Sequence, residues 1–400
     1  MDENVSRPKT LLLIAVAAIA AYAPMVRIPL IADDFPNISQ SITWGAPEGL
    51  PVLLHDAQFR LRATSYWTMF ALWQVGEVTP WVYHAASLML HILNAWLLVA
   101  VVGTWPRLRS AAPWAGFFFA IHEGHQEAVM WFSAVNELLM FGFGMASLWC
   151  WRQRRDTSSA ALFALALLSK ESAVILLPLF VLTDPGRWRR LAPHAVLAGL
   201  ALASVIESRG NSFRFNDGSF SLAAPYWITW PRSVARLMWF WGWPAAVGVW
   251  LTRDRHLRMI GWRALAWIGI ALAPYSFLTY STQIPSRQTY LASGGLAVLI
   301  GLAATRLPSR RLAALTVIVL LVHNVGYLWT KKREQFVERA APTAQLIAFA
   351  ESTKGQIRVR CFPLPKIVAE EAVRLGAGRS AGALVWVPTV GAAEFCYDGH

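Results

Sequence analysis

The sequence predicts an all-α protein that crosses a membrane many times and ends in a small α/β unit. Its composition points to this class. Hydrophobic residues make up 56% of the 400 positions and charged residues only 15%, whereas about a quarter of a soluble domain is charged. The mean hydropathy is +0.41, and the chain contains 21 tryptophans. A chain with so few charges cannot cover a water-facing surface of this size.

Apolar runs recur along the chain at lengths suited to a bilayer. A spanning helix needs about 20 apolar residues. The runs that approach this length are 10–31, 82–102, 133–151, 191–207, 236–252, 259–278, 289–305 and 311–329, with a shorter run at 112–122. Short arginine clusters separate them, at 107–109, 152–155, 187–190, 253–258 and 306–311. The net charge of +13 therefore indicates membrane orientation, with these clusters in the cytoplasm, and does not indicate nucleic-acid binding.

Residues 158–184 cannot form one ordinary span. Both flanks are basic, so the segment crosses an even number of times, yet it is too short for two full spans. Its middle carries Lys170 and Glu171. We expect two short helices with this pair at their junction, enclosed in a hydrated, protein-lined cavity because lipid cannot satisfy the charges. The total is then about 11 membrane segments, with the N-terminus inside and the C-terminus outside.

The character of the chain changes after residue 330. We expect a membrane domain at 1–330 and a small extracytoplasmic α/β domain at 331–400, with an amphipathic helix from 331, strands in IRVRCFPL and ALVWVP, and a helix in IVAEEAVRLGAG. Three cysteines are too few for a disulfide scaffold. Cys361 and Cys396 form a pair if this region faces an oxidising compartment, which the sequence leaves open.

Carboxylates in two outer loops are candidate catalytic groups. Asp33 and Asp34 follow the first span, and their mutual repulsion tends to raise the pKa of one of them. Such a carboxylate can accept a proton from an acceptor hydroxyl or hold a divalent cation, the one cofactor left open. Glu127 lies in the second outer loop, and Glu137 enters the next span, where an acid needs a partner. No metal site is expected, because the histidine spacing around His125 is not that of a zinc helix.

Other polar residues lie within or beside the spans. His84, His91 and Asn94 form a stripe that faces neighbouring helices, for which packing is a simpler explanation than catalysis. Cations near the outer boundary are Lys170, Arg236 and Arg287. A cation beside a membrane-embedded cavity suits the phosphate of a lipid carrier, and an arginine can contact it through two hydrogen bonds.

Five segments in order resemble the GT-C fold of lipid-phosphate-sugar glycosyltransferases, most closely the membrane half of the transmembrane-and-TPR O-mannosyltransferases. They are ADD (32–34), WVYHAASLMLHILNA (81–95), FAIHEGHQEAVMWFSAVNELL (119–139), LLSKESAVILLPLFVL (167–182) and PYSFLTYSTQIPSRQTYLASGG (274–295). The resemblance covers about residues 10–330. Val135 and Ser286 depart from the family's Arg and Glu, and no TPR array follows.

The resemblance implies an inverting transfer of a sugar from a polyprenyl-phosphate donor in the membrane to an extracytoplasmic acceptor, which is a glycan, a lipid or a protein. Asp33, with Asp34 beside it, would act on the acceptor hydroxyl, and Glu127 would be a second acid. The donor phosphate would meet Lys170, Arg287 and Arg236. Supporting polar residues would be His84, His91, Asn94, His125, Glu137, Glu171 and Tyr290.

Two other functions stay open from the sequence. A transporter or lipid flippase could use Lys170 and the histidine stripe as a path, although the inverted repeats common in transporters are not evident. A non-catalytic assembly partner with the same fold is motivated by Val135 and Ser286. We expect a bacterial inner membrane location with the site facing the periplasm. The sequence does not identify the sugar, the acceptor or the lipid length.

Overall fold

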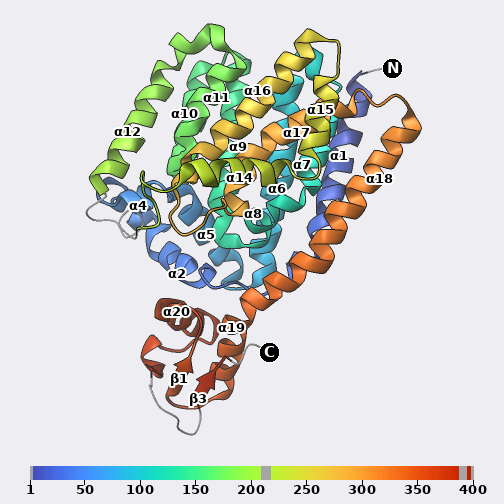
Figure 1. Cartoon of the computed structure of the whole chain (residues 1–400). Helices are drawn as coiled ribbons and strands as arrows, with labels where there is room; N and C mark the ends of the chain where they lie inside the picture. Colours follow the sequence, from blue (N-terminus) through green and yellow to red (C-terminus); the bar gives the residue numbers. More distant parts are fainter. Residues whose placement is uncertain (1–2, 209–217, 387–393, 398–400) are drawn as a thin grey trace.

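The computed structural model describes residues 3–208, 218–386 and 394–397, and most of them are helical. Figure 1 shows a large helical body with a small C-terminal unit at one end, next to α2 (Asp34–Trp44). The largely helical body and the α/β C-terminal region agree with the predicted fold class.

The long apolar helices match the expected runs. They are α1 (Glu3–Tyr22), α6 (Pro80–Gly103), α7 (Ala112–Ile121), α9 (Val135–Arg152), α12 (Ala192–Ser208), α16 (Arg255–Leu272), α17 (Tyr290–Ala304) and α18 (Arg310–Tyr327). Among the described residues, four helices can each cross a bilayer by length and hydropathy, and a fifth is added if the pair Glu123–Met130 and Phe132–Arg152, bent by 101°, is one span. The protein is therefore a multi-pass membrane protein, and the number of about 11 segments stays a prediction.

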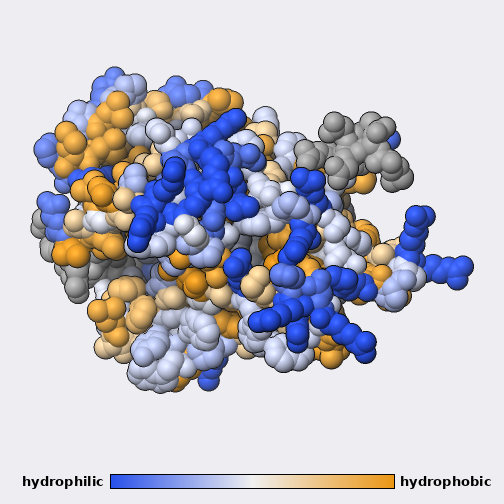
Figure 2. All heavy atoms as spheres, turned by 90° about the horizontal axis from the view of Figure 1, so that it is seen from above, coloured by the Kyte–Doolittle hydropathy of each residue, from blue (hydrophilic) through white to orange (hydrophobic). Residues whose placement is uncertain are grey.

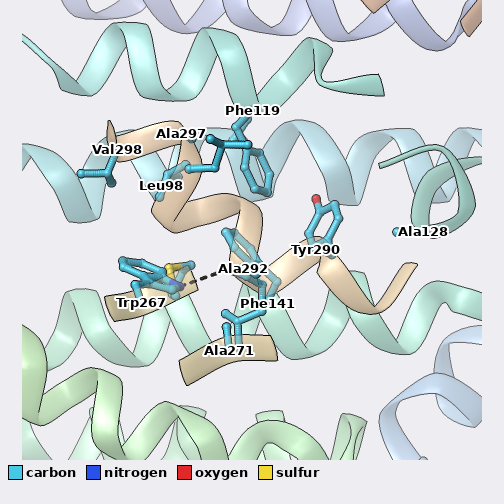
Figure 3. Close-up of a cluster of buried hydrophobic side chains, with 14 of the residues drawn as sticks. Leu98, Phe119, Ala128, Phe141, Trp267, Ala271, Tyr290, Ala292, Ala297 and Val298 are labelled. Carbon is cyan, nitrogen blue, oxygen red and sulfur yellow. Dashed lines mark hydrogen bonds between the residues drawn. The ribbon is translucent and has the colours of Figure 1, made fainter. Parts of the chain in front are cut away.

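Helix α17 is the centre of the body. Most of its side chains are buried, and it packs against α7, α16 and α15 (Gly242–Trp250). Figure 3 shows Phe119, Phe141 and Trp267 gathered around it, with the indole N–H of Trp267 donating to the Leu291 carbonyl at 3.0 Å. The small residues of its sequence, YLASGGLAVLIGLAA, let neighbouring backbones approach closely, which drives helix association in membranes.

The segment around Lys170 is broken as predicted. Helix α10 (Asp156–Ser169) ends at Lys170, whose backbone is extended, and a 3₁₀ turn (η6, Glu171–Ile175) leads into α11 (Leu176–Thr183). Lys170 is only 5% exposed, so protein encloses this junction, as the sequence requires.

One expected span is interrupted. The run 236–252 was predicted as a single helix, but α14 (Tyr226–Met238) extends only into its start and α15 begins at Gly242. Pro244 explains the break: it lacks the amide donor that a continuous helix would need there, and its ring would clash with the carbonyl of residue 240. Helix α14 carries both aromatic and basic side chains, and Trp227 and Trp230 are exposed.

The first outer loop is folded into short helices. These are α2, α3 (Val52–His55), α4 (Ala57–Arg60) and α5 (Ala63–Gly76). Trp44, Phe59 and Tyr66 pack their rings together with centroids 5.2 to 5.7 Å apart. This aromatic contact gives the loop a core of its own and holds the end of α2 against α4 and α5.

Helix α18 continues without a break into the C-terminal region. A π-helical turn (η10, Leu328–Lys332) joins it to α19 (Arg333–Ser352). There follow β1 (Ile357–Cys361), α20 (Lys366–Gly376), β2 (Leu384–Trp386) and β3 (Glu394–Cys396). The sheet order is β2-β1-β3, with both pairs parallel. The two expected strands and the second helix are confirmed, whereas β3 was not predicted.

Cys361 is disulfide-bonded, and Cys396 is its neighbour in the register of β1 and β3. The side chain of Cys396 lies outside the described part of the chain. Cys150 is buried and free. A disulfide fits an oxidising compartment, which is the side on which the sequence placed this region.

The opposite end of the molecule is polar. Figure 2 shows hydrophilic side chains gathered on the face away from the C-terminal unit, with hydrophobic ones around them. Exposed arginines from loops far apart in sequence include Arg109, Arg154, Arg190, Arg253 and Arg306. A concentration of arginine at one end is the pattern that positive cytoplasmic loops produce.

Close backbone contact at α17 makes a first prediction. A Cβ added to Gly301 would lie 2.6 Å from the Ala111 carbonyl oxygen, so the backbones would have to move apart. Overpacking of this kind costs about 1–3 kcal/mol, and we expect Gly301→Ala to lower the melting temperature of the detergent-solubilised protein. Gly248→Ala is the control, since no atom lies within 4 Å of its added Cβ. Equal melting temperatures for the two variants would contradict this packing.

Candidate active site

Asp34 links the first and second outer loops. Its carboxylate is fully buried, and one oxygen accepts the Ile31 amide at 2.8 Å. The other oxygen accepts both the amide and the hydroxyl of Ser133, at 2.7 and 2.6 Å. Asn37 donates to the same Ser133 hydroxyl at 3.0 Å. Asp34 therefore acts as a structural anchor between the two loops.

Asp33 lies at the entry to α2, and it is exposed. Ala32, just before it, has a positive φ of 38°, which turns the chain sharply between α1 and α2. The anchoring of Asp34 fixes the backbone of Asp33 at the outer surface of the loop. Of the two aspartates predicted to be catalytic, Asp33 is the one exposed to solvent.

Burial raises the pKa of Asp34 from 3.8 to about 7, although its hydrogen bonds to Ser133 and Ile31 oppose the shift. The charge of Asp33 raises the pKa further, by a smaller amount. The sequence indicated that one of the two neighbouring aspartates would have a raised pKa, and Asp34 does. The main cause is burial of Asp34, whereas repulsion by Asp33 contributes less.

Glu127 holds two arginines at the second outer loop. One carboxylate oxygen accepts the Arg287 amide at 3.2 Å and lies 3.7 Å from the Arg287 guanidinium. The other oxygen accepts from Arg339, on α19, at 3.2 Å. Arg287 also stacks over Trp131, 4.9 Å from its ring centroid. Burial opposes ionisation of Glu127, but these two arginines hold its pKa below the ordinary value.

Two buried ion pairs meet at the Lys170 junction. Lys170 pairs with Glu137, and Glu171 pairs with Arg62, whose second guanidinium nitrogen lies 3.1 Å from the carboxylate. Tyr275 completes the group, with its ring 4.7 Å from the Lys170 ammonium and its hydroxyl 3.4 Å from Glu137. Glu137 thus has the partner that an acid in a span requires. The sequence led us to expect Lys170 in a hydrated cavity. In the structure its ammonium is buried and paired with the Glu137 carboxylate instead.

The Asp34 loop, the Arg287 cluster and the Lys170 junction all contact one bent segment, Glu127–Glu137. Near its start Glu127 and Trp131 contact Arg287, Ser133 binds Asp34, and Glu137 binds Lys170. Ser133 and Glu137 are four residues apart, about one helical turn. The acidic loop and the basic junction, more than 130 positions apart in sequence, therefore converge at the N-terminal end of α9.

The predicted polar stripe is part of the interhelical packing. His91 hydrogen-bonds the Tyr290 hydroxyl at 2.7 Å, and Asn94 donates to the Leu138 carbonyl at 2.9 Å. His84 bonds the Ile28 carbonyl at 2.8 Å, and His125 bonds Ser293 at 2.5 Å. All of these side chains are buried. They join α6 and the second outer loop to α17 and to the chain after α1.

A cavity of about 620 Å³ adjoins the Glu127 cluster. It lies between α14, α18 and the second outer loop, and Arg236 is the predicted site residue that lines it. Glu123, Gln126 and Ser286 also line it, and the last two are chain neighbours of Glu127 and Arg287. The remaining wall includes Arg232, Trp239, Phe240, Trp241, His323 and Tyr327. Neither Asp33 nor Lys170 belongs to the lining.

Sequence reasoning missed three contacts at this site. Arg62 lies 109 residues from its partner Glu171, and nothing in the local sequence links the two. Ser133 gives no signal by itself. Arg339 lies beyond residue 330, in the region assigned to a separate domain.

The fold that carries these residues is known from other proteins. The fold is GT-C, the fold of membrane glycosyltransferases that work with polyprenyl-phosphate lipids, and the resemblance drawn from the sequence is confirmed at this level. ArnT from Cupriavidus metallidurans is similar in its apo structure, with a TM-score of 0.61, 14% identity and coverage of 96% of this chain and 86% of ArnT. The ArnT structure bound to undecaprenyl phosphate has a TM-score of 0.57 and 14% identity, and the match covers 91% of this chain and 84% of ArnT.

The archaeal oligosaccharyltransferase AglB from Archaeoglobus fulgidus, in complex with an inhibitory peptide and a dolichol-phosphate, is also similar. Its TM-score is 0.52 at 11% identity, over 95% of this chain and 64% of AglB. No family model and no curated protein matches the sequence. At these identities the likeness shows the fold, and the finer resemblance to O-mannosyltransferases stays a prediction.

The hydrogen bonds of Asp34 make a second prediction. Asp34→Asn replaces one acceptor oxygen by a donor, so that either Ile31 or Ser133 loses its partner, at about 1–3 kcal/mol. Asp33→Asn, at the exposed neighbour, serves as the matched control. We expect only the Asp34→Asn variant to melt at a clearly lower temperature.

The sign of the pH dependence follows from the raised pKa. A folded-state pKa above the unfolded value means that this group's contribution is complete below about pH 4 and is lost as pH rises through about 7. The difference in melting temperature between wild type and Asp34→Asn should shrink between about pH 5 and about pH 8. A constant difference would contradict the burial of a titrating carboxyl.

The Lys170 pair makes a third prediction. Lys170→Met leaves Glu137 buried and unpaired, which typically costs about 3–5 kcal/mol, whereas replacing both partners by apolar residues restores much of the stability. We expect Glu137→Leu/Lys170→Met to melt well above Lys170→Met. Donor binding by this double variant then tests Lys170 separately: unchanged binding removes Lys170 from the phosphate contacts, and lost binding with restored stability keeps it there.

Proposed function

We propose that this protein transfers a sugar from a polyprenyl-phosphate donor to an acceptor at the extracytoplasmic face of the membrane, with inversion at the sugar. The observation that carries the proposal is the convergence on Glu127–Glu137 of an exposed carboxylate loop and a cationic cluster beside an amphiphilic cavity. The GT-C fold supports the general class. The donor, the acceptor and the stereochemistry are our inference.

The cavity suits a lipid phosphate in its chemistry. Arg232 and Arg236 stand one turn apart on α14 and have no ion-pair partner among the described residues. Arg232 donates to the Thr282 hydroxyl at 3.3 Å and Arg236 donates to the Ile284 carbonyl at 3.4 Å, and both hydrogen bonds are long. Trp239 and Phe240, which follow them, are exposed and apolar. Cations next to exposed aromatic side chains fit a ligand with a phosphate at one end and a hydrocarbon chain at the other.

Arg236 and Arg287 are the phosphate contacts we favour. Arg236 lines the cavity, and Arg287 borders it through Ser286. Arginine donors can contact a phosphate oxygen pair and stabilise the charge that grows on the departing phosphate. Lys170 is the less accessible of the three predicted cations, because its ammonium is buried against Glu137. Its contribution to this proposal is to hold α9 and the Lys170 junction together.

Asp33 is the proposed general base. In a single displacement, the acceptor oxygen attacks the anomeric carbon while its proton passes to the Asp33 carboxylate. The bond from that carbon to the phosphate oxygen breaks, and polyprenyl phosphate leaves with the bonding electron pair. Attack opposite the leaving group inverts the anomeric centre. Glu127 keeps its negative charge next to Arg287 and Arg339, so we assign it to positioning these arginines.

The fourth prediction tests the function directly. Purified protein is incubated with a panel of polyprenyl-phosphate sugars and candidate acceptors, and release of the free carrier is measured. We expect release with at least one donor, and a fall of about 10²- to 10⁴-fold for Asp33→Asn, the range over which a general base contributes. Near-wild-type turnover by Asp33→Asn at unchanged melting temperature would remove Asp33 from catalysis.

The same assay separates the alternatives. Flux of a lipid or ion across liposomes with no glycosyl product would favour a transporter or flippase. Intact binding of polyprenyl phosphate with no turnover on any acceptor would favour an assembly partner, for which Val135, fully buried, and Ser286 supply the motive.

A further inference from the structure

The helix that begins as α18 carries the C-terminal region to the candidate site. Residues Arg310–Ser352 form one continuous helical run. Its upper part lines the cavity with His323 and Tyr327, and its lower part brings Arg339 to Glu127. Figure 1 shows this run descending along one side of the body to the C-terminal unit. The residues after 330 therefore belong to the site environment.

The lower part of this run is firmly docked. Phe336 and Ala340 are buried in the main core, and the Thr343 hydroxyl contacts the Leu30 carbonyl at 3.4 Å, just before Asp33. Helix α20 rests on α2, where Arg374 donates to Ser39 at 2.6 Å. These contacts fix the position of Arg339 relative to both outer loops.

Cations outnumber carboxylates around this point. Lys332 interacts electrostatically with Glu123, Glu127, Arg236 and Arg339. With Arg287, which binds the same Glu127, the group contains Arg236, Arg287, Lys332 and Arg339 against Glu123 and Glu127. The excess of positive charge beside the cavity calls for an anion.

Arg339 has hydrogen-bonding capacity to spare. Its side chain is 48% exposed, and its guanidinium uses one nitrogen for Glu127. That is its one hydrogen bond among residues 3–208, 218–386 and 394–397. Guanidinium has five N–H donors, so Arg339 can keep Glu127 and still bind phosphate oxygens.

The π turn decides which residue reaches this position. Residues eleven apart on an α-helix share a face, since 11 steps of about 100° nearly complete three turns. A regular helix would therefore place Glu338 below Tyr327. The π turn at Leu328–Lys332 adds one residue to the turn, so Arg339 takes that face. An arginine in place of a glutamate reverses the charge presented to Glu127.

We propose that Arg339 is a donor-phosphate-binding residue, supplied to the cavity edge from the C-terminal region and acting beside Arg287. This rests on the proposed function, in which the donor is a lipid-linked phosphate. The ligand chemistry is a phosphate ester carried on a membrane lipid. Arg339 touches the donor headgroup and takes no part in proton transfer at Asp33.

The experiment compares Arg339→Gln and Arg339→Lys with Arg333→Gln, an exposed arginine on the same helix. Binding of undecaprenyl phosphate to the full chain in detergent is the probe. A hydrogen bond to a charged group contributes about 1.5–3 kcal/mol, so we expect Arg339→Gln to bind roughly 10- to 100-fold more weakly. Arg339→Lys should lie between, because it keeps the charge and loses the paired donors, and Arg333→Gln should bind like wild type.

Steady-state kinetics give a readout that a merely structural role would not produce. We expect Arg339→Gln to raise KM for the donor while kcat and the melting temperature stay close to wild type. Binding within about twofold of wild type in both Arg339 variants would overturn the proposal, since a lost charged hydrogen bond costs more than that. If Arg339→Gln does not fold, the comparison of Arg339→Lys with wild type decides.

Two further outcomes separate the possible failures. If Arg339→Gln loses binding of phosphatidylglycerol but keeps undecaprenyl phosphate, Arg339 is a general headgroup contact and the proposal falls while the proposed function stands. If wild type itself binds no polyprenyl phosphate, the proposed function fails and Arg339 loses its ligand with it.

Discussion

The outer end of this protein depends on the hydrogen bonds between Asp34 and Ser133. Asp34 is an ionisable group taken fully out of water, and such a group is tolerated only where hydrogen-bonding partners surround it. Its donors come from its own loop and from the loop before α9. The chain from α1 is thereby fixed to the segment that also binds Arg287 and Lys170. This link acts together with the Asn37–Ser133 hydrogen bond and with the packing of Phe35 and Ile38 against Phe132 and Val135.

A second constraint lies one turn further along α9. Two ion pairs, Lys170 with Glu137 and Arg62 with Glu171, are enclosed at a break in the helices. Buried pairs of this kind add little to net stability, because the cost of removing both ions from water offsets their attraction. An arrangement that separates one partner from the other leaves a buried, unpaired charge, which is strongly destabilising. Wrong packing of α10 against α5 and α9 is penalised in this way.

The sequence indicated where a charged residue in an apolar run needs a helix break or a partner. It could not indicate which distant residue is that partner. Lys170 and Glu171 predicted a broken helix because an apolar run cannot bury them unaided, and Glu137 predicted a partner for the same reason. Which charges pair depends on folding over 33 and 109 positions, so Arg62 was not identified. The break before Gly242 was missed because the residues on both sides of it are apolar, so hydropathy shows one uninterrupted run, although Pro244 marked the break. Arg339 was missed because a change in composition at residue 330 suggested a domain boundary, where the structure has an unbroken helix.

The π turn in this helix has a consequence for comparing sequences. Its extra residue changes the length of the chain and leaves the downstream contacts of Phe336, Arg339 and Thr343 unaltered. A related chain one residue shorter between 328 and 332 would run as an ordinary α-helix and deliver an equivalent arginine to the same place. An alignment without a gap here would pair that arginine with Glu338 and report a charge reversal that the folded molecules do not have.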